Sequence, residues 1–160
     1  MLLRCCVRGD SAADSPKAEQ IKDNPRMIRP CFLVIDREFP GSISTRKLVL
    51  ETAKFNVLTA YSGPEALETF RRYPALDGIV MDGEMDDISA EDLARNFKEV
   101  RPNIPVIVIC APGGPECPSA DFHVESFQPA KLLETLRSLK PVESEQIEKH
   151  DEDLSREKLR

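Results

Sequence analysis

The sequence lacks a long hydrophobic run and lacks an excess of basic residues. None of its apolar stretches approaches membrane-spanning length, and none has the form of a secretory signal core. Its 22 Lys and Arg residues stand against 28 Asp and Glu, which gives a formal net charge of −6. Proteins that bind nucleic-acid backbones normally carry a basic face. These absences argue against a membrane protein and against a nucleic-acid binder, and we expect a cytoplasmic protein.

Cysteines in metal-binding spacing are also missing. The five cysteines are Cys5, Cys6, Cys31, Cys110 and Cys117, an odd number without C-x-x-C pairs. This favours reduced thiols over a disulfide framework or a zinc site. The polar, aperiodic start of the chain predicts a disordered extension over residues 1–28, within which Met27 is a candidate alternative start.

What the sequence does contain is an alternation of apolar strands and amphipathic helices. Strands are predicted at 31–35, 56–61, 78–82, 104–110 and 124–127, and helices at 42–54, 62–73, 89–100 and 129–139. This order predicts an α/β domain over residues 29–140, with a parallel sheet covered on both faces. In such sheets the working residues lie beyond the carboxyl ends of the strands.

Two of the helices have recognisable starts. Ser62 and Glu65 form the pattern of a capping box, in which each side chain accepts a hydrogen bond from the backbone near the other. After an N-cap at residue 89, Leu93, Phe97 and Val100 recur at helical spacing. We therefore expect these three side chains to face the core.

The two segments that follow the fourth and fifth strands are less regular. Between residues 110 and 128, five helix-breaking residues exclude a regular helix: Pro112, Gly113, Gly114, Pro115 and Pro118.

Residues 141–160 are dense in charges of both signs, and their apolar residues are too sparse for a coiled-coil seam. We interpret 141–160 as a charged, solvated and partly helical tail, with a partner-binding helix as the alternative.

Five segments in order carry a family resemblance: "FLVIDRE", "TAYSGPEAL", "GIVMDGEMDD", "NIPVIVICA" and "FQPAKLLETL". Together they make the chain resemble the response-regulator receiver domain of bacterial two-component systems, from about Arg29 to Lys140. The resemblance implies a flavodoxin-like, doubly wound sheet of five parallel strands in the order 2-1-3-4-5. The family's fourth helix would here be lost or replaced by a loop.

The resemblance also implies roles for single residues. The aspartate that ends the third strand, which accepts a phosphoryl group from a histidine kinase in that family, is Asp82. The family's Mg²⁺ is held by two adjacent acids after the first strand, by the acceptor, and by the backbone carbonyl two residues later. Asp36, Asp82 and Glu84 would supply these ligands if Mg²⁺ is bound.

This sequence departs from the family at the remaining pocket positions. Arg37 stands at the position of the second acid, Cys110 at the position of the hydroxyl residue that ends the fourth strand, and Gln128 at the position of the phosphate-binding lysine. Glu125 stands at the position of the family's aromatic switch residue. An arginine beside the acids could pair with Asp36 or Asp82 and stand in for the metal, or it could point to solvent. The sequence leaves these alternatives open.

Three functions are compatible with this pattern. The first is a stand-alone receiver-like signalling domain that acts through protein–protein interaction, with an atypical pocket and weak or no phosphorylation of Asp82. The second is a fully functional, Mg²⁺-dependent phosphoacceptor. The third is an enzyme with Cys110 as nucleophile, against which a small buried thiol is the simpler interpretation. We expect the first, not an enzyme, and a histidine kinase or another signalling protein as the partner.

Overall fold

The computed structural model describes residues 28–37, 44–126 and 128–159. The predicted extension over residues 1–28 and the question of Met27 as the start therefore fall almost wholly outside the described residues. The strands are β1 Cys31–Ile35, β2 Asn56–Ala60, β3 Gly78–Asp82, β4 Val106–Cys110 and β5 Phe122–Glu125. The helices are α1 Thr45–Thr52, α2 Gly63–Arg72, α3 Ala90–Val100, α4 Pro129–Leu139 and α5 Pro141–Lys158.

The five strands form one parallel sheet in the order β2-β1-β3-β4-β5. This confirms the predicted flavodoxin-like topology. Strand order reverses at β1, which pairs with β2 on one side and with β3 on the other. At this point Ile35 is paired with Met81, so the carboxyl ends of β1 and β3 lie level. A doubly wound sheet places its functional crevice at such a switch point.

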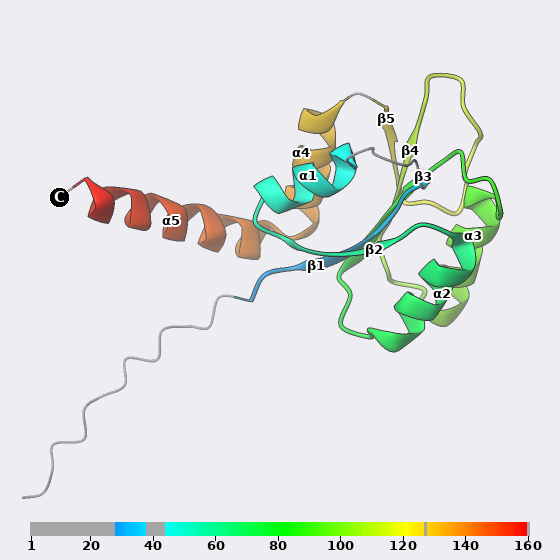
Figure 1. The fold of residues 1–160 in the computed structure, drawn as a ribbon, viewed down its shortest axis with the longest axis horizontal. Coiled ribbons are helices and arrows are strands. Elements are labelled where there is room, and N and C mark those ends of the chain that lie inside the picture. Colours follow the sequence, from blue (N-terminus) through cyan, green and yellow to red (C-terminus); the bar gives the residue numbers. More distant parts are fainter. Residues whose placement is uncertain (1–27, 38–43, 127, 160) are drawn as a thin grey trace, which may run out of the picture.

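Helices cover both faces of the sheet, as Figure 1 shows: α2 and α3 lie on one side, and α1 and α4 on the other. Successive side chains of a strand point to opposite faces. Leu33 in β1 therefore belongs to the same core cluster as Phe97 of α3, whereas Val34 belongs to the cluster that contains Leu50 of α1 and Leu136 of α4. The inner strands β1, β3 and β4 are apolar nearly throughout because both of their faces are buried, whereas the edge strands β2 and β5 also carry exposed residues.

The helix starts largely follow the sequence prediction. Ser62 accepts a hydrogen bond from the backbone of Glu65 at 3.3 Å, but the Glu65 carboxylate accepts from Tyr61 at 2.7 Å rather than from Ser62 itself. The expected reciprocal cap is thus displaced by one residue. Val100, which was expected in the core, is 54% exposed because it is the last residue of α3.

The connection from β4 to β5 contains no helix over residues 111–121, all of which the structure describes. This confirms the predicted loop, although β5 begins at Phe122, two residues before the predicted strand. Glu91 at the start of α3 fastens the loop, because its carboxylate accepts hydrogen bonds from Ser119 N at 2.9 Å and from Ser119 Oγ at 2.6 Å. The pKa of Glu91 is lowered to about 2, mainly by these two bonds and in smaller part by hydrogen bonds from Cys117 and Arg95.

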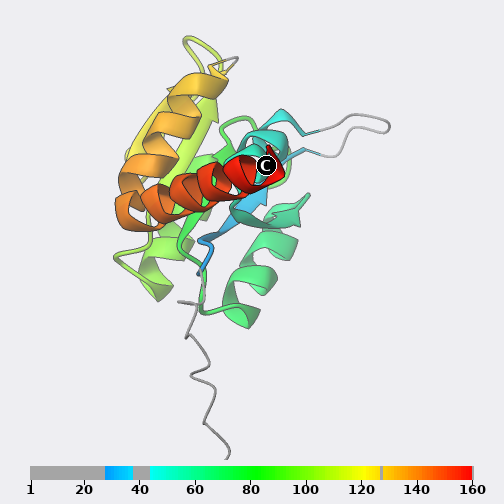
Figure 2. The same ribbon diagram turned by 90° about the vertical axis from the view of Figure 1, so that its left-hand side faces the viewer.

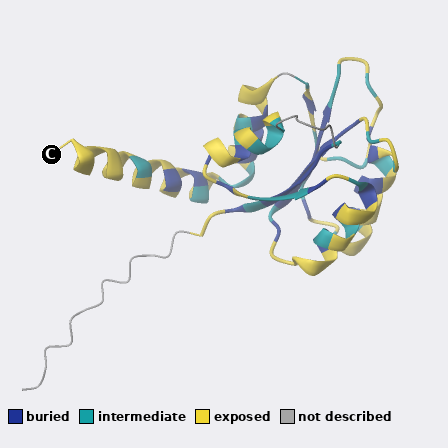
Figure 3. Ribbon diagram, in the orientation of Figure 1, coloured by how far each residue is buried: buried dark blue, intermediate teal, exposed yellow. Residues whose placement is uncertain are grey.

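Helix α5 extends away from the sheet (Figures 1 and 2), and its burial changes along its length (Figure 3). Ile147 is only 3% exposed and joins the core beneath α1 and α4, whereas Leu154 is 42% exposed. The prediction of a solvated tail is therefore wrong at Ile147, and the tail is one 18-residue helix. The predicted domain boundary after residue 140 stays a prediction. None of the described helices combines the length and the hydropathy of a membrane-spanning segment.

Candidate functional site

Two buried carboxylates lie side by side at the switch point of the sheet. Asp82 is the last residue of β3, and Asp36 directly follows β1. Because Ile35 and Met81 are paired neighbours, the residue after each of them emerges at the same edge. Asp36 is 5% exposed and Asp82 is 6% exposed. Such buried charges require counter-charges and hydrogen-bond donors.

The main counter-charge comes from Arg46 in the first turn of α1. Its Nη1 atom forms a close ion pair with Asp36 Oδ1, and its Nη2 atom lies 3.1 Å from Asp82 Oδ2. One guanidinium group therefore bridges both carboxylates. At about 4 Å and an effective dielectric near 20, each such charge pair contributes roughly 4 kcal/mol of Coulomb attraction.

The sequence analysis missed Arg46, although a signal for it exists. A helix that directly follows a strand of a parallel sheet begins at the carboxyl edge of that sheet. A cation in the first turn of a helix is disfavoured by the helix dipole. An arginine in the first turn of α1 is therefore favoured where an acid lies close by, and Asp36 lies at that edge directly after β1.

Arg37 contributes a second positive charge to Asp82. Its Nε atom lies 3.4 Å from Asp82 Oδ2, and its Nη2 atom lies 3.5 Å from Glu84 Oε2. The sequence left open whether Arg37 pairs with an acid of the pocket or points to solvent. In the structure it pairs with Asp82, the acceptor position. The other oxygen of Asp82, Oδ1, accepts a hydrogen bond from the backbone N–H of Glu84 at 2.9 Å. Both carboxylate oxygens of Asp82 are therefore engaged.

Ser44 fixes the start of α1 relative to Asp36. Its hydroxyl donates a short hydrogen bond to Asp36 Oδ2, and its oxygen accepts from the backbone N–H of Lys47 at 3.2 Å as the N-cap of α1. Ser44 and Arg46 thus both connect the first turn of α1 to the same carboxylate. This double contact explains how the arginine is held over the acid pair.

In this arrangement the pocket does not fit Mg²⁺. Oxygens of Asp36 and Asp82 that a metal would need already face the guanidinium of Arg46, and the Glu84 carboxylate faces Arg37. Nor do the described residues contain a group of three or more His, Cys, Asp or Glu side chains placed to hold a metal ion. The positive charge that a hard cation would supply is provided here by side chains.

Cys110, at the end of β4, lies against the backbone that follows Asp82. A Cβ atom on Gly83 would be only 2.1 Å from its sulfur. Partial burial and the negative charges of Asp82 and Glu84 raise the pKa of Cys110, which keeps the thiol protonated. Cys110 is half-buried rather than buried, and a neutral thiol in an acidic pocket is a poor nucleophile.

Gln128, the N-cap residue of α4, interacts with Glu125. Its side-chain amide donates to the carboxylate of Glu125 at 3.1 Å, so two of the departures from the family pattern pair with each other. Of the predicted pocket residues, the structure brings Asp36, Arg37, Glu84 and Cys110 to Asp82 and adds Ser44 and Arg46.

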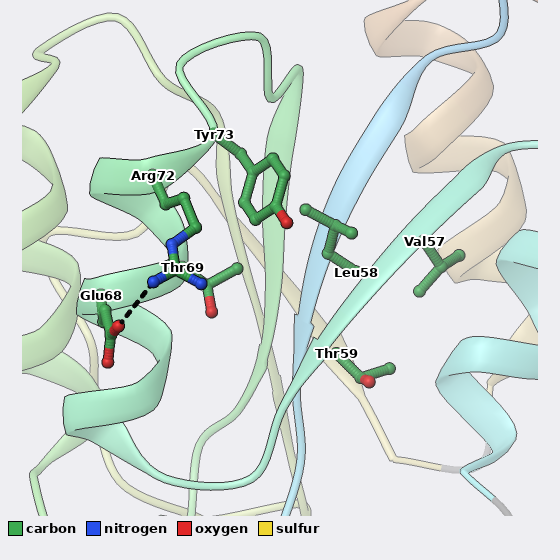
Figure 4. Close-up of a pocket in the computed structure, with 7 residues that line it drawn as sticks. All are labelled: Val57, Leu58, Thr59, Glu68, Thr69, Arg72 and Tyr73. Carbon is green, nitrogen blue, oxygen red and sulfur yellow. Dashed lines mark hydrogen bonds and ion pairs between the residues drawn. The ribbon is translucent and has the colours of Figure 1, made fainter.

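A separate hollow of about 320 Å³ lies between edge strand β2 and helix α2 (Figure 4). Leu58 and Tyr73 point toward each other there, and Arg72 pairs with Glu68 at 3.2 Å. None of the predicted pocket residues lines this hollow. Its lining is mixed polar and apolar, and it has no convergent set of reactive groups.

Comparison with known proteins agrees with the fold. No protein-family model matches the chain. Two transcriptional regulatory proteins, GlrR of Escherichia coli (strain K12) and QseF of Escherichia coli O157:H7, are each 31% identical over 85 residues. These matches cover 53% of this chain and 19% of each relative, so the chain corresponds to a small part of their length.

Solved structures match over more of the chain. The response regulator TrrA from Thermotoga maritima, in complex with Mg²⁺ and BeF, is 27% identical with a TM-score of 0.57, and the match covers 69% of this chain and 98% of that one. A CheY-like receiver domain protein from Methanospirillum hungatei JF-1 is 17% identical with a TM-score of 0.62, covering 74% and 99%. The chain thus has the fold of response-regulator receiver domains, and it is similar to response regulators in sequence.

Proposed function

We propose that this protein is a receiver-like signalling domain of a two-component phosphorelay that acts through protein–protein interaction. In this proposal Asp82 has the position of the phosphoacceptor but is phosphorylated weakly or not at all. The single observation that carries the proposal is the guanidinium of Arg46, which pairs with Asp36 and also lies 3.1 Å from Asp82 Oδ2.

The physical reason lies in what phosphoryl transfer to a carboxylate requires. The attacking oxygen must be free, and cations must neutralise the incoming phosphoryl oxygens as they approach. Here Oδ2 of Asp82 faces Arg46 and Arg37, while Oδ1 accepts from the backbone of Glu84. An incoming phosphoryl group would have to break these pairs before it could react.

Two further groups that would hold a phosphoryl oxygen are replaced. Cys110 offers a thiol, which is a weak hydrogen-bond donor, in place of a hydroxyl. Gln128 carries no charge and bonds to Glu125. The pocket therefore has two arginines close to the acceptor, and the position of the family's lysine is occupied by the uncharged Gln128.

The second candidate function is a Mg²⁺-dependent phosphoacceptor. It is favoured by the adjacent buried carboxylates, Asp36 at 5% and Asp82 at 6% exposure, and by the similarity to TrrA. For this function Asp36, Asp82 and the backbone carbonyl of Glu84 would hold the metal once Arg46 had moved. The metal would supply positive charge to the transferring phosphoryl group.

We further propose a cytoplasmic protein without enzymatic activity of its own, whose partner is a histidine kinase or another signalling protein. The names of GlrR and QseF point to transcription, but the match covers 19% of each relative. The acidic balance of this chain, a net charge of −6, favours a protein partner over nucleic acid.

Acetyl phosphate tests the proposed function directly. The full chain is incubated with acetyl phosphate and Mg²⁺, and its intact mass is measured for the wild type, Asp82→Ala and the exposed control Asp86→Ala. We expect no stoichiometric gain of a phosphoryl group in any of the three proteins. A full gain in the wild type and in Asp86→Ala that is lost in Asp82→Ala would overturn the proposal in favour of the second candidate.

A further inference from the structure

Arg46 occupies the space between two acids that a bound cation would otherwise fill. We propose that Arg46 is a built-in cation that excludes divalent metal ions from the pocket of Asp36 and Asp82, and that removing its charge creates a metal site there. This inference rests on the proposed function only in that both concern the same pocket.

The first step of the argument is the sharing of one guanidinium by two carboxylates. Separate nitrogens, Nη1 and Nη2, face Asp36 Oδ1 and Asp82 Oδ2. Both acids are almost fully removed from solvent. Two adjacent buried carboxylates repel each other strongly unless a positive charge lies between them. The arginine therefore meets the same electrostatic need that a metal ion would meet.

The second step is that the acids are also positioned by other contacts. Ser44 donates to Asp36 Oδ2, and the backbone N–H of Glu84 donates to Asp82 Oδ1 at 2.9 Å. Asp36 and Asp82 also follow directly from paired strands of the sheet. Loss of the Arg46 side chain would therefore leave both carboxylates near their present positions, with Oδ1 of Asp36 released and Oδ2 of Asp82 still facing Arg37 Nε at 3.4 Å.

The third step concerns the chemistry of these oxygens. Carboxylate oxygens are the ligands that Mg²⁺ and Mn²⁺ prefer, and the backbone carbonyl of Glu84 is a third oxygen in the segment after Asp82. Arg37 would remain near Asp82, at 3.4 Å. Its positive charge lowers the affinity of the new site without filling the space between the acids.

The experiment measures Mn²⁺ binding by the full chain, using the electron paramagnetic resonance signal of free Mn²⁺ together with titration calorimetry. The variants are Arg46→Gln and Arg46→Met, which remove the charge, and Arg46→Lys, which keeps it. Arg72→Ala removes an exposed arginine far along α2 and serves as the matched control. Arg46→Gln combined with Asp36→Asn tests whether a new site lies in this pocket.

We expect no saturable site in the wild type, in Arg46→Lys or in Arg72→Ala. Arg46→Gln and Arg46→Met should each bind one Mn²⁺ with an affinity at least about tenfold higher than that of the wild type, since a unit charge at contact distance is removed. The double variant with Asp36→Asn should lose this site. A saturable Mn²⁺ site in the wild type that is lost in the single variant Asp36→Asn would overturn the inference, whether or not the Arg46 variants fold.

Failure of this inference can be told from failure of the proposed function. If folded Arg46→Gln and Arg46→Met bind no Mn²⁺, the inference fails, while a wild type without phosphoryl uptake still supports the proposed function. If the wild type takes up a phosphoryl group on Asp82 without a bound metal, the proposed function fails while Arg46 keeps its role. Metal counting and mass measurement thus report on separate claims.

Discussion

The sulfur of Cys110 lies where a side chain on Gly83 would begin. A Cβ atom at residue 83 would be 2.1 Å from this sulfur and 3.2 Å from a methyl group of Val108. The backbone has little freedom to withdraw, because Gly83 N donates to Ile109 O at 2.8 Å across the β3–β4 pairing. Position 83 therefore has room only for glycine, because the thiol at the end of the neighbouring strand fills the space that a side chain would need.

Gly83→Ala should destabilise the protein by about 1–3 kcal/mol, the usual cost of overpacking a tight site. Cys110→Ala removes the clashing sulfur, so the double variant Gly83→Ala/Cys110→Ala should recover most of this loss. Urea unfolding of the wild type, both single variants and the double variant measures the coupling. If Gly83→Ala costs the same with and without Cys110, the steric explanation is wrong.

Arg46 and Asp36 should be strongly coupled in stability. Arg46→Met leaves two buried carboxylates without their shared counter-charge, and Asp36→Asn removes one of these charges. The double-mutant cycle should give a coupling of about 0.5–3 kcal/mol. The same cycle for the exposed pair of Lys47 and Glu51, 3.8 Å apart, should give no more than about 0.5 kcal/mol. Equal couplings in the two cycles would contradict the picture of a buried acid pocket.

Glu91 should make the stability fall in acid. Its folded-state pKa of about 2 lies below the ordinary value of 4.5, because Ser119 donates two hydrogen bonds to the carboxylate. Its contribution is therefore fully present above pH 4.5 and is lost as the pH falls toward 2. Urea midpoints from pH 6 to pH 2.5 should decline more steeply for the wild type than for Glu91→Gln. Parallel declines would show that the Ser119 contacts do not lower this pKa in solution.

Ile147 should mark the point at which α5 stops contributing to the core. Ile147→Ala should cost about 2–4 kcal/mol, because a buried side chain is removed from a packed cluster. Leu154→Ala, two turns further along the same helix, should change stability by less than about 0.5 kcal/mol. Chemical denaturation compares the two variants. A similar small effect for both would mean that the start of α5 is not docked in solution.

The fold was accessible to sequence reasoning because its signals are local. Apolar runs on both faces of a strand and helices with polar outer faces are visible in short windows, and the alternation of the two restricts the topology. The helix predicted at 129–139 matches α4 residue for residue. The positions of Asp36 and Asp82 followed from the rule that parallel strands present their functional residues at one edge.

The pocket itself was accessible only in part. The choice of Arg37 between Asp82 and solvent depends on side-chain packing that no local pattern encodes. Arg46 lies 36 residues before Asp82 in the chain, and only the pairing of β1 with β3 brings the start of α1 next to Asp82. Val100 and Ile147 were misjudged for a related reason, since periodicity does not tell where a helix leaves the surface that buries it.

Helix α5 is attached to the rest of the domain near its first residues and projects beyond them. Lys140 at its base pairs with Asp77 at 2.6 Å, and Ile147 fixes its second turn in the core. Beyond Ile147 the helix runs on to Lys158 with mostly exposed side chains. At a rise of about 1.5 Å per residue this free arm is roughly 16 Å long, so a tilt of about 10° at Ile147 displaces its tip by roughly 3 Å. A tilt of α5 at Ile147 would therefore move the far end of the helix more than it moves the residues beneath α1 and α4.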